Sequence, residues 1–367
     1  MKIFFRCLLA LMSLILGIES SCDETAAAVV EDGFRVLSSE VASQIAKHAV
    51  HGGVVPELAA REHLKALDPV VTEALEKAQV KAEDIDCVAV TQGPGLIPAL
   101  LVGLSYAKGL SSNLNVPLVG VNHFMAHIYG AFLDGNNEEL TDPENYPLLA
   151  LVVSGGHTSL VLVSADGSAR QLGCTIDDAA GEALDKGSKL LDLGYPGGPV
   201  ISRIAENGNP EAFNFPRPLT GGAGKALAPE HRYNFSFSGI KTALLYHTQR
   251  NGGVENFSEE FLNDTVASYQ MAVVDTLVKK TMLAAKDFQV KQIVLAGGVA
   301  CNKLLRQLVI ERAPRNVKVR IAPPKYCTDN AAMVGGIGFH SFKKGEFISH
   351  DADSFARLPG IVRVPFL

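Results

Sequence analysis

The chain has 367 residues, of which 47% are hydrophobic and 20% are charged, and its formal net charge is −6. This length predicts two domains, and the composition is ordinary for a globular enzyme. The negative charge excludes a global basic field, so a nucleic acid partner would have to bind a local patch. The six cysteines form no C-x-x-C pair, so we expect reduced thiols in a cytoplasmic protein.

Residues 1–11 contain a basic residue and an apolar run, as a signal peptide does, but no small-x-small cleavage site follows them. A second methionine, Met12, stands just before the first strand-like segment. We therefore interpret residues 1–11 as a mis-called start or a disordered extension, with translation beginning at Met12. The rest of the sequence contains no apolar run long enough to cross a bilayer, so we expect no membrane association.

The first half of the chain alternates strand-like and helix-like segments. Residues 14–18 and 26–30 read as two strands around the acidic turn 19–25, a hairpin that could present hydroxyl and N–H groups to a phosphate or a metal. A plain surface hairpin is equally compatible with that stretch. Further strands are expected at 36–44, 86–91 and 117–121, and helices at 58–77 and 96–110.

A pair of histidines, His123 and His127, follows the strand at 117–121. On a helix, residues four apart share one face, so both rings can reach one metal ion. The spacing is that of the zinc-protease motif H-E-x-x-H, but Phe124 stands where that motif requires its catalytic carboxylate. The pair alone is compatible with a metal site or with ordinary packing.

The second half repeats the pattern of the first. Residues 148–153 and 159–163 read as strands around a Gly-Gly turn, and a second Gly-Gly turn follows the strand-like segment 293–296. The repetition predicts a duplicated α/β fold with a ligand cleft between the copies. Glycine turns at the carboxyl ends of strands let phosphates approach bare amides, which favours a nucleotide ligand.

Two acidic residues allow two interpretations each. Asp185, in a helical insert at about 175–250, could accept hydrogen bonds from ribose hydroxyls or pair with Lys186 or Lys189. Asp329 could be the N-cap of the small-residue helix that follows it, or a third metal ligand supplied by the second domain. We divide the chain into an N-terminal subdomain at 12–142, a C-terminal subdomain at 143–345 and a tail at 346–367.

The motifs together resemble those of the TsaD family of tRNA threonylcarbamoyladenosine transferases, once described as O-sialoglycoprotein endopeptidases. They run in the family's order: GIESSCDET at 17–25, GGVVPE at 52–57, the histidine pair, SGGHT at 154–158, DDAAGE at 177–182, YPGGP at 195–199, FSFSGIK at 235–241, AGGVACN at 296–302 and CTDN at 327–330. The resemblance implies an α/β fold of duplicated actin/Hsp70/sugar-kinase-like (ASKHA) domains. It departs at residues 124–126, where relatives often carry an acidic residue before the second histidine.

The resemblance also implies the site residues. One Fe²⁺ per subunit would be held by His123, His127 and Asp329, and other divalent metals would be compatible with the same ligands. The implied nucleotide contacts are Val152, Val153, Ser154, Gly155, Gly156, Asp185, Gly198 and Asn302. The implied reaction moves threonylcarbamoyl from threonylcarbamoyl-AMP to N6 of adenosine 37 in tRNAs that read codons beginning with adenine. The general base is not assigned, and His157, Asp23 and Glu24 are weak candidates.

The family further implies tRNA, a TsaB-like paralogue and a TsaE-like ATPase as partners. The best local patch for the RNA backbone is the basic segment, which we define as Lys303, Arg306, Arg312, Arg315, Lys318, Arg320 and Lys325. A solvated helix face explains such a run equally well. Two other classes of function remain as alternatives: a metallopeptidase, which lacks its glutamate here, and a non-catalytic nucleotide switch, which would not need the histidines and Asp329 together.

Overall fold

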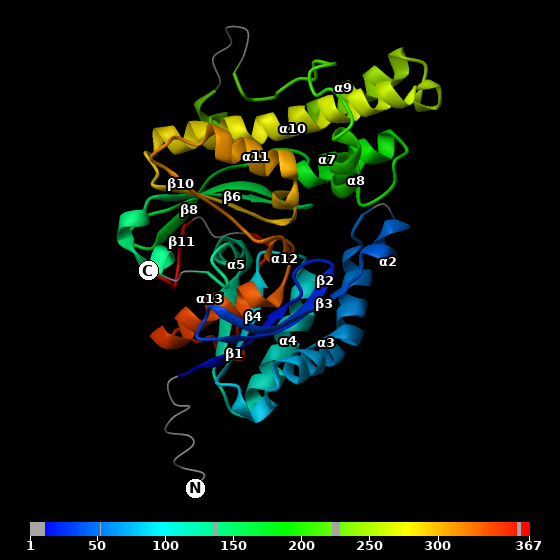
Figure 1. The fold of residues 1–367 in the computed structure, drawn as a ribbon. Coiled ribbons are helices and arrows are strands. Elements are labelled where there is room, and N and C mark those ends of the chain that lie inside the picture. The colour runs from blue at the N-terminus through cyan, green and yellow to red at the C-terminus, as the bar shows by residue number, and fades with distance from the viewer. Residues whose placement is uncertain (1–11, 52, 136–137, 222–227, 358–360) are drawn as a thin grey trace. The chain divides into compact units, whose positions relative to one another are not determined.

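The computed structural model describes residues 12–51, 53–135, 138–221, 228–357 and 361–367, so residues 1–11 lie outside the described part (Figure 1). The chain forms two compact units. Unit 1 comprises Met1–Asp142 and Asp329–Leu367, and unit 2 comprises Pro143–Thr328. Within the described residues, no helix is both long and apolar enough to span a membrane.

The sheet of unit 1 has the strand order β3-β2-β1-β4-β5. Strand β1 is antiparallel to β2, and β2 to β3, whereas β1, β4 and β5 are parallel. The apolar runs that predicted these strands are confirmed within a few residues, with bounds β1 (Leu14–Glu19), β2 (Glu24–Glu31), β3 (Arg35–Ser43), β4 (Cys87–Gly93) and β5 (Leu118–Asn122).

Helices cover both faces of this sheet. Because side chains alternate along a strand, Leu16 and Ile18 of β1 pack in one core cluster with α3 (Pro56–Ala78) and α4 (Ile97–Leu114). The opposite face lies against α13 (Ala331–Lys344). The remaining elements of unit 1 are α2 (Ile45–Ala49), η1 (Ala82–Asp84), α5 (His123–Gly130), α6 (Glu138–Thr141) and β11 (Ile361–Arg363).

Helix α13 lies unusually close to β1 because both elements carry glycine at the crossing point. A Cβ atom on Gly17 would stand 2.2 Å from the carbonyl oxygen of Ala331 and 2.6 Å from the backbone nitrogen of Gly335. Any larger residue at position 17 would push the helix off the sheet. This close packing fixes the start of α13, and therefore the adjoining Asp329, relative to the strands of unit 1.

The five strands that unit 2 supplies repeat the topology of unit 1, in the order β10-β9-β6-β7-β8. Strands β6, β7 and β8 pair antiparallel, and β6, β9 and β10 pair parallel. The sheet read from β8 therefore has the same order and directions as the sheet of unit 1 read from β3. The predicted duplication is confirmed, with bounds β6 (Leu148–Val153), β7 (Thr158–Val163), β8 (Ser168–Cys174), β9 (Gln292–Ala296) and β10 (Lys318–Ile321).

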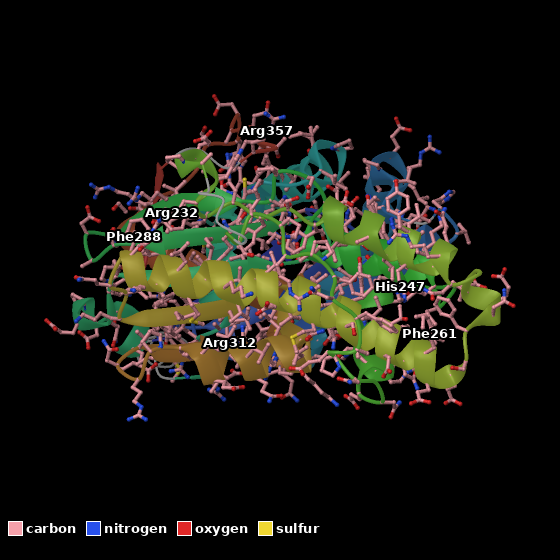
Figure 2. The ribbon with its side chains drawn as sticks, turned by 90° about the horizontal axis from the view of Figure 1, so that it is seen from above. Arg232, His247, Phe261, Phe288, Arg312 and Arg357 are labelled. Carbon is pink, nitrogen blue, oxygen red and sulfur yellow. The ribbon has the colours of Figure 1, made fainter. Side chains whose placement is uncertain are left out.

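The helices of unit 2 are gathered around the long α10 (Glu259–Asp287), which is largely buried along its length. Figure 2 shows Arg312 beside α10, and its guanidinium lies 2.6 Å from the carboxylate of Asp275. The other elements are η2 (Pro143–Asn145), α7 (Ala180–Leu190), α8 (Gly197–Ala205), η3 (Pro229–His231), α9 (Ser238–Arg250), η4 (Val254–Asn256), η5 (Gly298–Cys301), α11 (Lys303–Arg312) and α12 (Pro324–Cys327).

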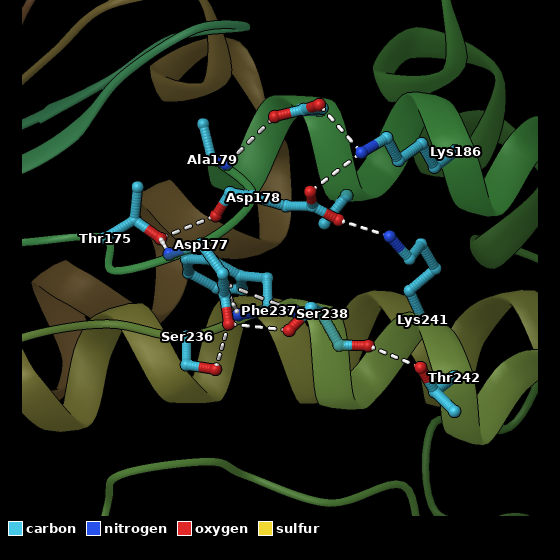
Figure 3. A network of polar contacts seen from close by, with 12 residues as sticks. Thr175, Asp177, Asp178, Ala179, Lys186, Ser236, Phe237, Ser238, Lys241 and Thr242 are labelled. Atoms are coloured by element: carbon cyan, nitrogen blue, oxygen red, sulfur yellow. Dashed lines mark hydrogen bonds and ion pairs between the residues drawn. The ribbon is translucent and has the colours of Figure 1, made fainter.

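Two neighbouring aspartates connect the start of the helical insert to α9 (Figure 3). Asp177 accepts hydrogen bonds from the hydroxyls of Ser236 and Ser238, at 2.5 and 2.6 Å. Asp178 lies 2.7 Å from the ammonium groups of both Lys186 and Lys241. The DDAAGE and FSFSGIK segments therefore form one hydrogen-bonded network. The charged residues Asp177, Asp178 and Lys241 of these segments thus have a structural role.

One predicted domain boundary requires correction. We assigned 143–345 to the C-terminal subdomain, with 346–367 as a tail, but the segment from Asp329 onward belongs to unit 1. The physical reason is the packing of α13 on β1, β2 and β4, which the local sequence of a small-residue helix does not reveal. Asp329 is consequently a residue of the same unit as the two histidines, and the prediction that the second domain supplies it was wrong.

Candidate metal centre and nucleotide-binding turns

Helix α5 places the two histidines on one side of a buried turn. The Asn122 side chain caps the helix by accepting from the backbone N–H groups of Phe124 and Met125, at 3.1 and 3.2 Å. His123 and His127 follow at the spacing of one turn, and their ring centroids lie 4.6 Å apart. Both imidazoles are buried.

Asp329 completes the cluster from the segment just before α13. Its Oδ1 lies 3.1 Å from Nε2 of His127 and 3.5 Å from Nε2 of His123. One ligand atom from each of the three residues lies within 4.8 Å of the others. The N-cap interpretation of Asp329 is not confirmed, because Asn330 caps α13 by accepting from the N–H of Met333 at 3.0 Å.

Glu19, which sequence reasoning missed, stands behind His123. Its side chain is fully buried, and its Oε2 lies 3.0 Å from Nδ1 of His123 and accepts from the hydroxyl of Thr91 at 2.7 Å. Its Oε1 accepts from the N–H of Ser21. With Nδ1 of His123 facing a carboxylate, Nε2 is the nitrogen available for a ligand, the arrangement common behind metal-binding histidines.

The electrostatics fit a site for a cation. Burial alone would lower the pKa of His123, but the carboxylates of Glu19 and Asp329 outweigh it and raise the pKa to about 9. Nδ1 of His127 is buried with no hydrogen-bond partner in the described part of the chain. The convergence of the Nε2 atoms of both histidines on one carboxylate oxygen is what a ligand set requires. Two imidazoles and one carboxylate suit a borderline divalent ion.

Replacing Glu19 by glutamine is expected to weaken metal binding about ten-fold, at the lower end of what the loss of such a supporting residue does. The amide oxygen can still accept from His123, but the negative charge that raises the basicity of the imidazole is gone. Affinity for Zn²⁺ or Co²⁺ would be measured by competition with a chromophoric chelator. Glu31→Gln, a surface carboxylate that pairs with Arg35 at 2.7 Å, is the matched control and should bind as the parent chain does. Equal affinity in Glu19→Gln would show that Glu19 is only a packing residue.

Glu24, one of the three candidate bases, begins β2 in unit 1. Its Oε1 accepts from the hydroxyl of Ser43 at 2.9 Å, and its Oε2 is buried without a hydrogen-bond partner among the described residues. Burial raises the pKa of Glu24 to about 7. A carboxyl group that titrates near neutrality can take up a proton under working conditions, which a surface carboxylate does poorly. Asp23 precedes it in the same turn, whereas His157 belongs to unit 2.

The raised pKa of Glu24 predicts a pH-dependent stability. Because the folded pKa of about 7 exceeds the ordinary value of 4.5, the folded state binds the proton more tightly, and stability falls as the pH rises from about 4.5 to 7. Glu24→Gln retains an acceptor for Ser43 and removes the titration. We expect its melting temperature to exceed that of the parent chain above pH 7, with the difference vanishing near pH 4.5. A constant difference at every pH would contradict the burial of the charge.

The glycine turns of unit 2 present bare backbone. The turn between β6 and β7 is closed by the N–H of Ser154 donating to the carbonyl of His157 at 2.8 Å. A Cβ added to Gly155, Gly156 or Gly198 would meet nothing within 4 Å. The space that a side chain would fill at these glycines is therefore open, whereas Val152 and Val153, which precede the turn, are buried in the sheet.

Two close approaches bring these turns together within unit 2. A Cβ on Gly181, in the first turn of α7, would stand 2.6 Å from the carbonyl oxygen of Ser154. Gly297, at a φ of +92°, would place a Cβ 2.3 Å from the carbonyl oxygen of Val153, so only glycine closes the turn after β9. The turns after β6 and β9 and the start of α7 therefore form one region of unit 2.

Asp185 and Asn302 have structural contacts of their own. Asp185 accepts from the N–H of Gly197 at 2.7 Å, which ties α7 to the start of α8. Its predicted alternative partner, Lys186, pairs instead with Asp178 and with Glu182, at 2.7 and 2.8 Å. Asn302 caps α11 by accepting from the N–H of Leu305 and donates to Gln270 at 2.8 Å.

Several members of the basic segment serve the fold. Arg306 donates to the carbonyls of Ala300 and Ala322, and Arg312 pairs with Asp275. Lys318 donates to the side chain of Asn145, and Lys303 pairs with Glu206 at an exposed position. These contacts hold α11 and the segment after it against the rest of unit 2, so these four side chains have structural roles. The role of the segment in RNA binding stays a prediction.

The comparisons with known proteins agree with the motifs. The family described as "TsaD: tRNA N6-adenosine threonylcarbamoyltransferase" matches residues 35–336. The chain belongs to the TsaD family. Among its relatives, the tRNA N6-adenosine threonylcarbamoyltransferase of Syntrophotalea carbinolica is 53% identical over 89% of this chain and 90% of the relative. The protein of the same name from Symbiobacterium thermophilum is 49% identical over 95% of this chain and 96% of the relative.

Solved structures with the same fold are much more distant in sequence. Full-length HypF in its phosphate- and nucleotide-bound form aligns with a TM-score of 0.54 at 13% identity, over 91% of this TsaD chain and 47% of HypF. The HypF of T. kodakarensis gives 0.53 at 15% identity, over 91% and 48%. At such identity the likeness concerns the fold alone. With the repeated strand order of the two units, the predicted ASKHA fold is confirmed.

Proposed function

We propose that this TsaD-family chain transfers the threonylcarbamoyl group of threonylcarbamoyl-AMP to N6 of adenosine 37 in tRNAs that read codons beginning with adenine. The observation that carries the proposal is the convergence of His123, His127 and Asp329 in unit 1 of a chain that matches the family over residues 35–336. The product is the tRNA nucleoside t6A.

The chemistry divides into three tasks. The adenine amine attacks the carbamoyl carbon, the bond from that carbon to the phosphate oxygen breaks, AMP leaves with the electron pair, and the amine loses a proton. The protein must hold AMP, stabilise charge on the carbonyl oxygen and accept the proton. The donor is already activated as a mixed anhydride, so no covalent intermediate with the protein is needed.

Unit 2 contributes the nucleotide contacts in this proposal. Gly155, Gly156 and Gly198 leave open the space that a side chain would fill, so a phosphate could approach their backbone, and their amides would donate to its oxygens. Asp185, whose Oδ1 accepts from the N–H of Gly197, would accept from ribose hydroxyls. Asn302 would contact the adenosine half of the donor. Val152, Val153 and Ser154 would form the floor beneath the phosphates.

Unit 1 contributes the metal ligands. His123, His127 and Asp329 would hold one Fe²⁺, which supplies a Lewis acid for carbonyl or phosphate oxygens when bound. Glu19 holds the ring of His123 in the orientation that the ligand requires. Among the candidate bases, Glu24 is favoured, because its pKa of about 7 lets its carboxylate accept the proton of the amine near neutral pH.

The residues around the histidine pair do not support the two alternative functions, a metallopeptidase and a non-catalytic nucleotide switch. A metallopeptidase of the H-E-x-x-H class needs a glutamate directly after the first histidine, and the residue there is the buried Phe124. A non-catalytic nucleotide switch would not require two buried histidines, an aspartate and a supporting glutamate in one cluster. The proposed transferase would use both histidines and Asp329 as metal ligands and Glu19 as their support.

The direct test is mass spectrometry of tRNA nucleosides after incubation with threonylcarbamoyl-AMP and Fe²⁺. We expect t6A in a substrate tRNA with adenosine at position 37 and none in a tRNA with guanosine there. The His123→Ala, His127→Ala double variant is the matched inactive protein. Modification that is equal in the double variant would refute the role of the metal centre, and its absence in the parent chain with all partners present would refute the transferase.

A TsaB-like paralogue and a TsaE-like ATPase are the protein partners in this proposal, and the cytoplasm is the compartment. A mainly apolar groove on α3 and α4 supports a protein partner for unit 1. It is lined by Leu64, Leu67, Leu101, Val102 and Tyr106, with Asp68 and Ser105 as its polar residues. Leu64 is 70% exposed there and Leu101 41%. Such a surface favours association, because burying it removes apolar area from water.

We expect Leu64→Glu to weaken binding of the TsaB-like paralogue at least about ten-fold, since a charge would be buried in an apolar contact. Binding would be measured by titration calorimetry. Leu245→Glu, at a leucine of α9 in unit 2 that is 36% exposed, is the control. Unchanged affinity in Leu64→Glu would exclude the groove as the docking surface.

A further inference from the structure

Two cysteines of unit 2 interact where η5, after β9, packs against α12. Cys301 ends η5 and is exposed, whereas Cys327 ends α12 and is buried. The two thiols interact with each other, and the Cys327 thiol donates to the carbonyl of Ala322 at 3.2 Å. Cys301 Sγ also lies 3.9 Å from the carbonyl oxygen of Pro324, the first residue of α12. The two sulfur atoms are therefore neighbours, although 26 positions separate them in the sequence.

Arg306 brings a positive charge to the pair. Its guanidinium NH2 donates to Cys327 Sγ at 3.3 Å and to the carbonyl of Ala322 at 2.8 Å, and its Nε donates to the carbonyl of Ala300. These bonds fix the guanidinium between η5 and the segment that leads to α12. A cation held in this way stabilises a thiolate beside it.

The other described cysteines differ from Cys301. The interaction with Cys327 and the charge of Arg306 lower the pKa of Cys301 to about 6, against the effect of burial, whereas the same interaction and burial raise the pKa of the Cys327 thiol well above its ordinary value. Burial raises the pKa of Cys22 and Cys174, and it raises that of Cys87 to about 12. A thiol is reactive as its thiolate, so Cys301 combines exposure with the reactive form and the other three do not.

We propose that Cys301 and Cys327 form a redox modification site, in which a low-molecular-weight disulfide oxidises the two thiols to an intramolecular disulfide. The Cys301 thiolate attacks one sulfur of the oxidant, the S–S bond of the oxidant breaks, and one thiolate leaves. Cys327 then attacks Cys301 Sγ, passes its proton to the departing group and displaces the second thiol. The protein loses two hydrogens, and one small disulfide is reduced to two thiols.

The position of the pair gives the bond a structural consequence. Cys301 directly precedes Asn302, which caps α11 and bonds to Gln270. A disulfide would link η5 covalently to α12 and so restrict the turn after β9. This step does not depend on the proposed reaction of the protein, because it concerns only the thiols.

The test uses the full chain and oxidised glutathione at neutral pH, followed by intact mass measurement and peptide mapping. The parent chain should lose two hydrogens, with the crosslink mapped to Cys301 and Cys327. Cys327→Ser should stop at a mixed disulfide and gain one glutathione on Cys301. Cys301→Ser should acquire neither, and Cys174→Ser should react as the parent chain does.

A second measurement does not require the variants to fold. Alkylation of the native parent chain by iodoacetamide, followed by peptide mapping, should label Cys301 at least about five-fold faster than Cys174, after allowing for the lower nucleophilicity of a more acidic thiol. Comparable labelling of the two cysteines would overturn the proposal. A crosslink between any other pair of cysteines in the oxidised protein would overturn it as well.

Discussion

A chain in which both His123 and His127 are replaced by alanine is expected to retain no bound metal. Two of the three converging ligand atoms would be gone, and a single carboxylate does not hold a borderline divalent ion. Asp329→Ala should lose metal in part, because water can take the place of one carboxylate oxygen. Metal content would be measured by elemental analysis after reconstitution with Fe²⁺ in the absence of oxygen.

The control for this experiment is His51→Ala, which removes an exposed histidine and should leave the metal content unchanged. Circular dichroism would establish that each variant is folded. A full metal complement in a folded double-histidine variant would show that the ion binds elsewhere. It would refute the assignment of His123, His127 and Asp329 as the metal ligands.

Asp185→Ala is expected to raise the KM for threonylcarbamoyl-AMP roughly ten- to hundred-fold while the metal stays bound. Losing a charged acceptor for ribose hydroxyls costs about 1.5–3 kcal/mol, which corresponds to that change in affinity. A metal-ligand variant should instead lose turnover at saturating donor, because a contact that stabilises charge in the transition state is removed. Donor titrations with t6A as the readout separate the two effects.

The contact from Gly197 to Asp185 sets the control for this titration. Asp185→Asn retains an oxygen that can accept from the Gly197 N–H, so the link between α7 and α8 should persist while the charge is lost. We expect a smaller rise in KM than for alanine and an unchanged melting temperature. If Asp185→Ala lowers stability but leaves the KM as it was, the residue only supports the start of α8.

The elements of the fold could be predicted because their signals are local. Apolar runs located β1 and β6, and the spacing of four between His123 and His127 placed both rings on one side of a helix. Repetition of strand, glycine turn and strand predicted the duplication, which the identical strand orders confirm. These patterns depend only on backbone periodicity, so a single sequence carries them.

The supporting residues of the candidate site could not be predicted in the same way. Glu19 reaches His123 across 104 positions, and in the sequence it is one more acid in a polar turn. Asp329 and Asn330 are both good N-cap residues, and only the packing of α13 shows that Asn330 has that role. Likewise, the run of lysines and arginines after Lys303 gave no sign that Arg306 bonds to two backbone carbonyls.

The interrupted course of unit 1 has a consequence for how the protein is made. His127 and Asp329 are separated by 202 positions, and all of unit 2 lies between them in the chain. At roughly 5–20 residues per second, the ribosome adds Asp329 about 10–40 s after His127. During that interval β1 lacks the helix that covers one of its faces, whereas unit 2 is continuous and can fold as soon as it emerges. The candidate metal centre is therefore among the last features of the molecule to assemble, and premature release of the chain before α13 leaves the two histidines without the carboxylate of Asp329.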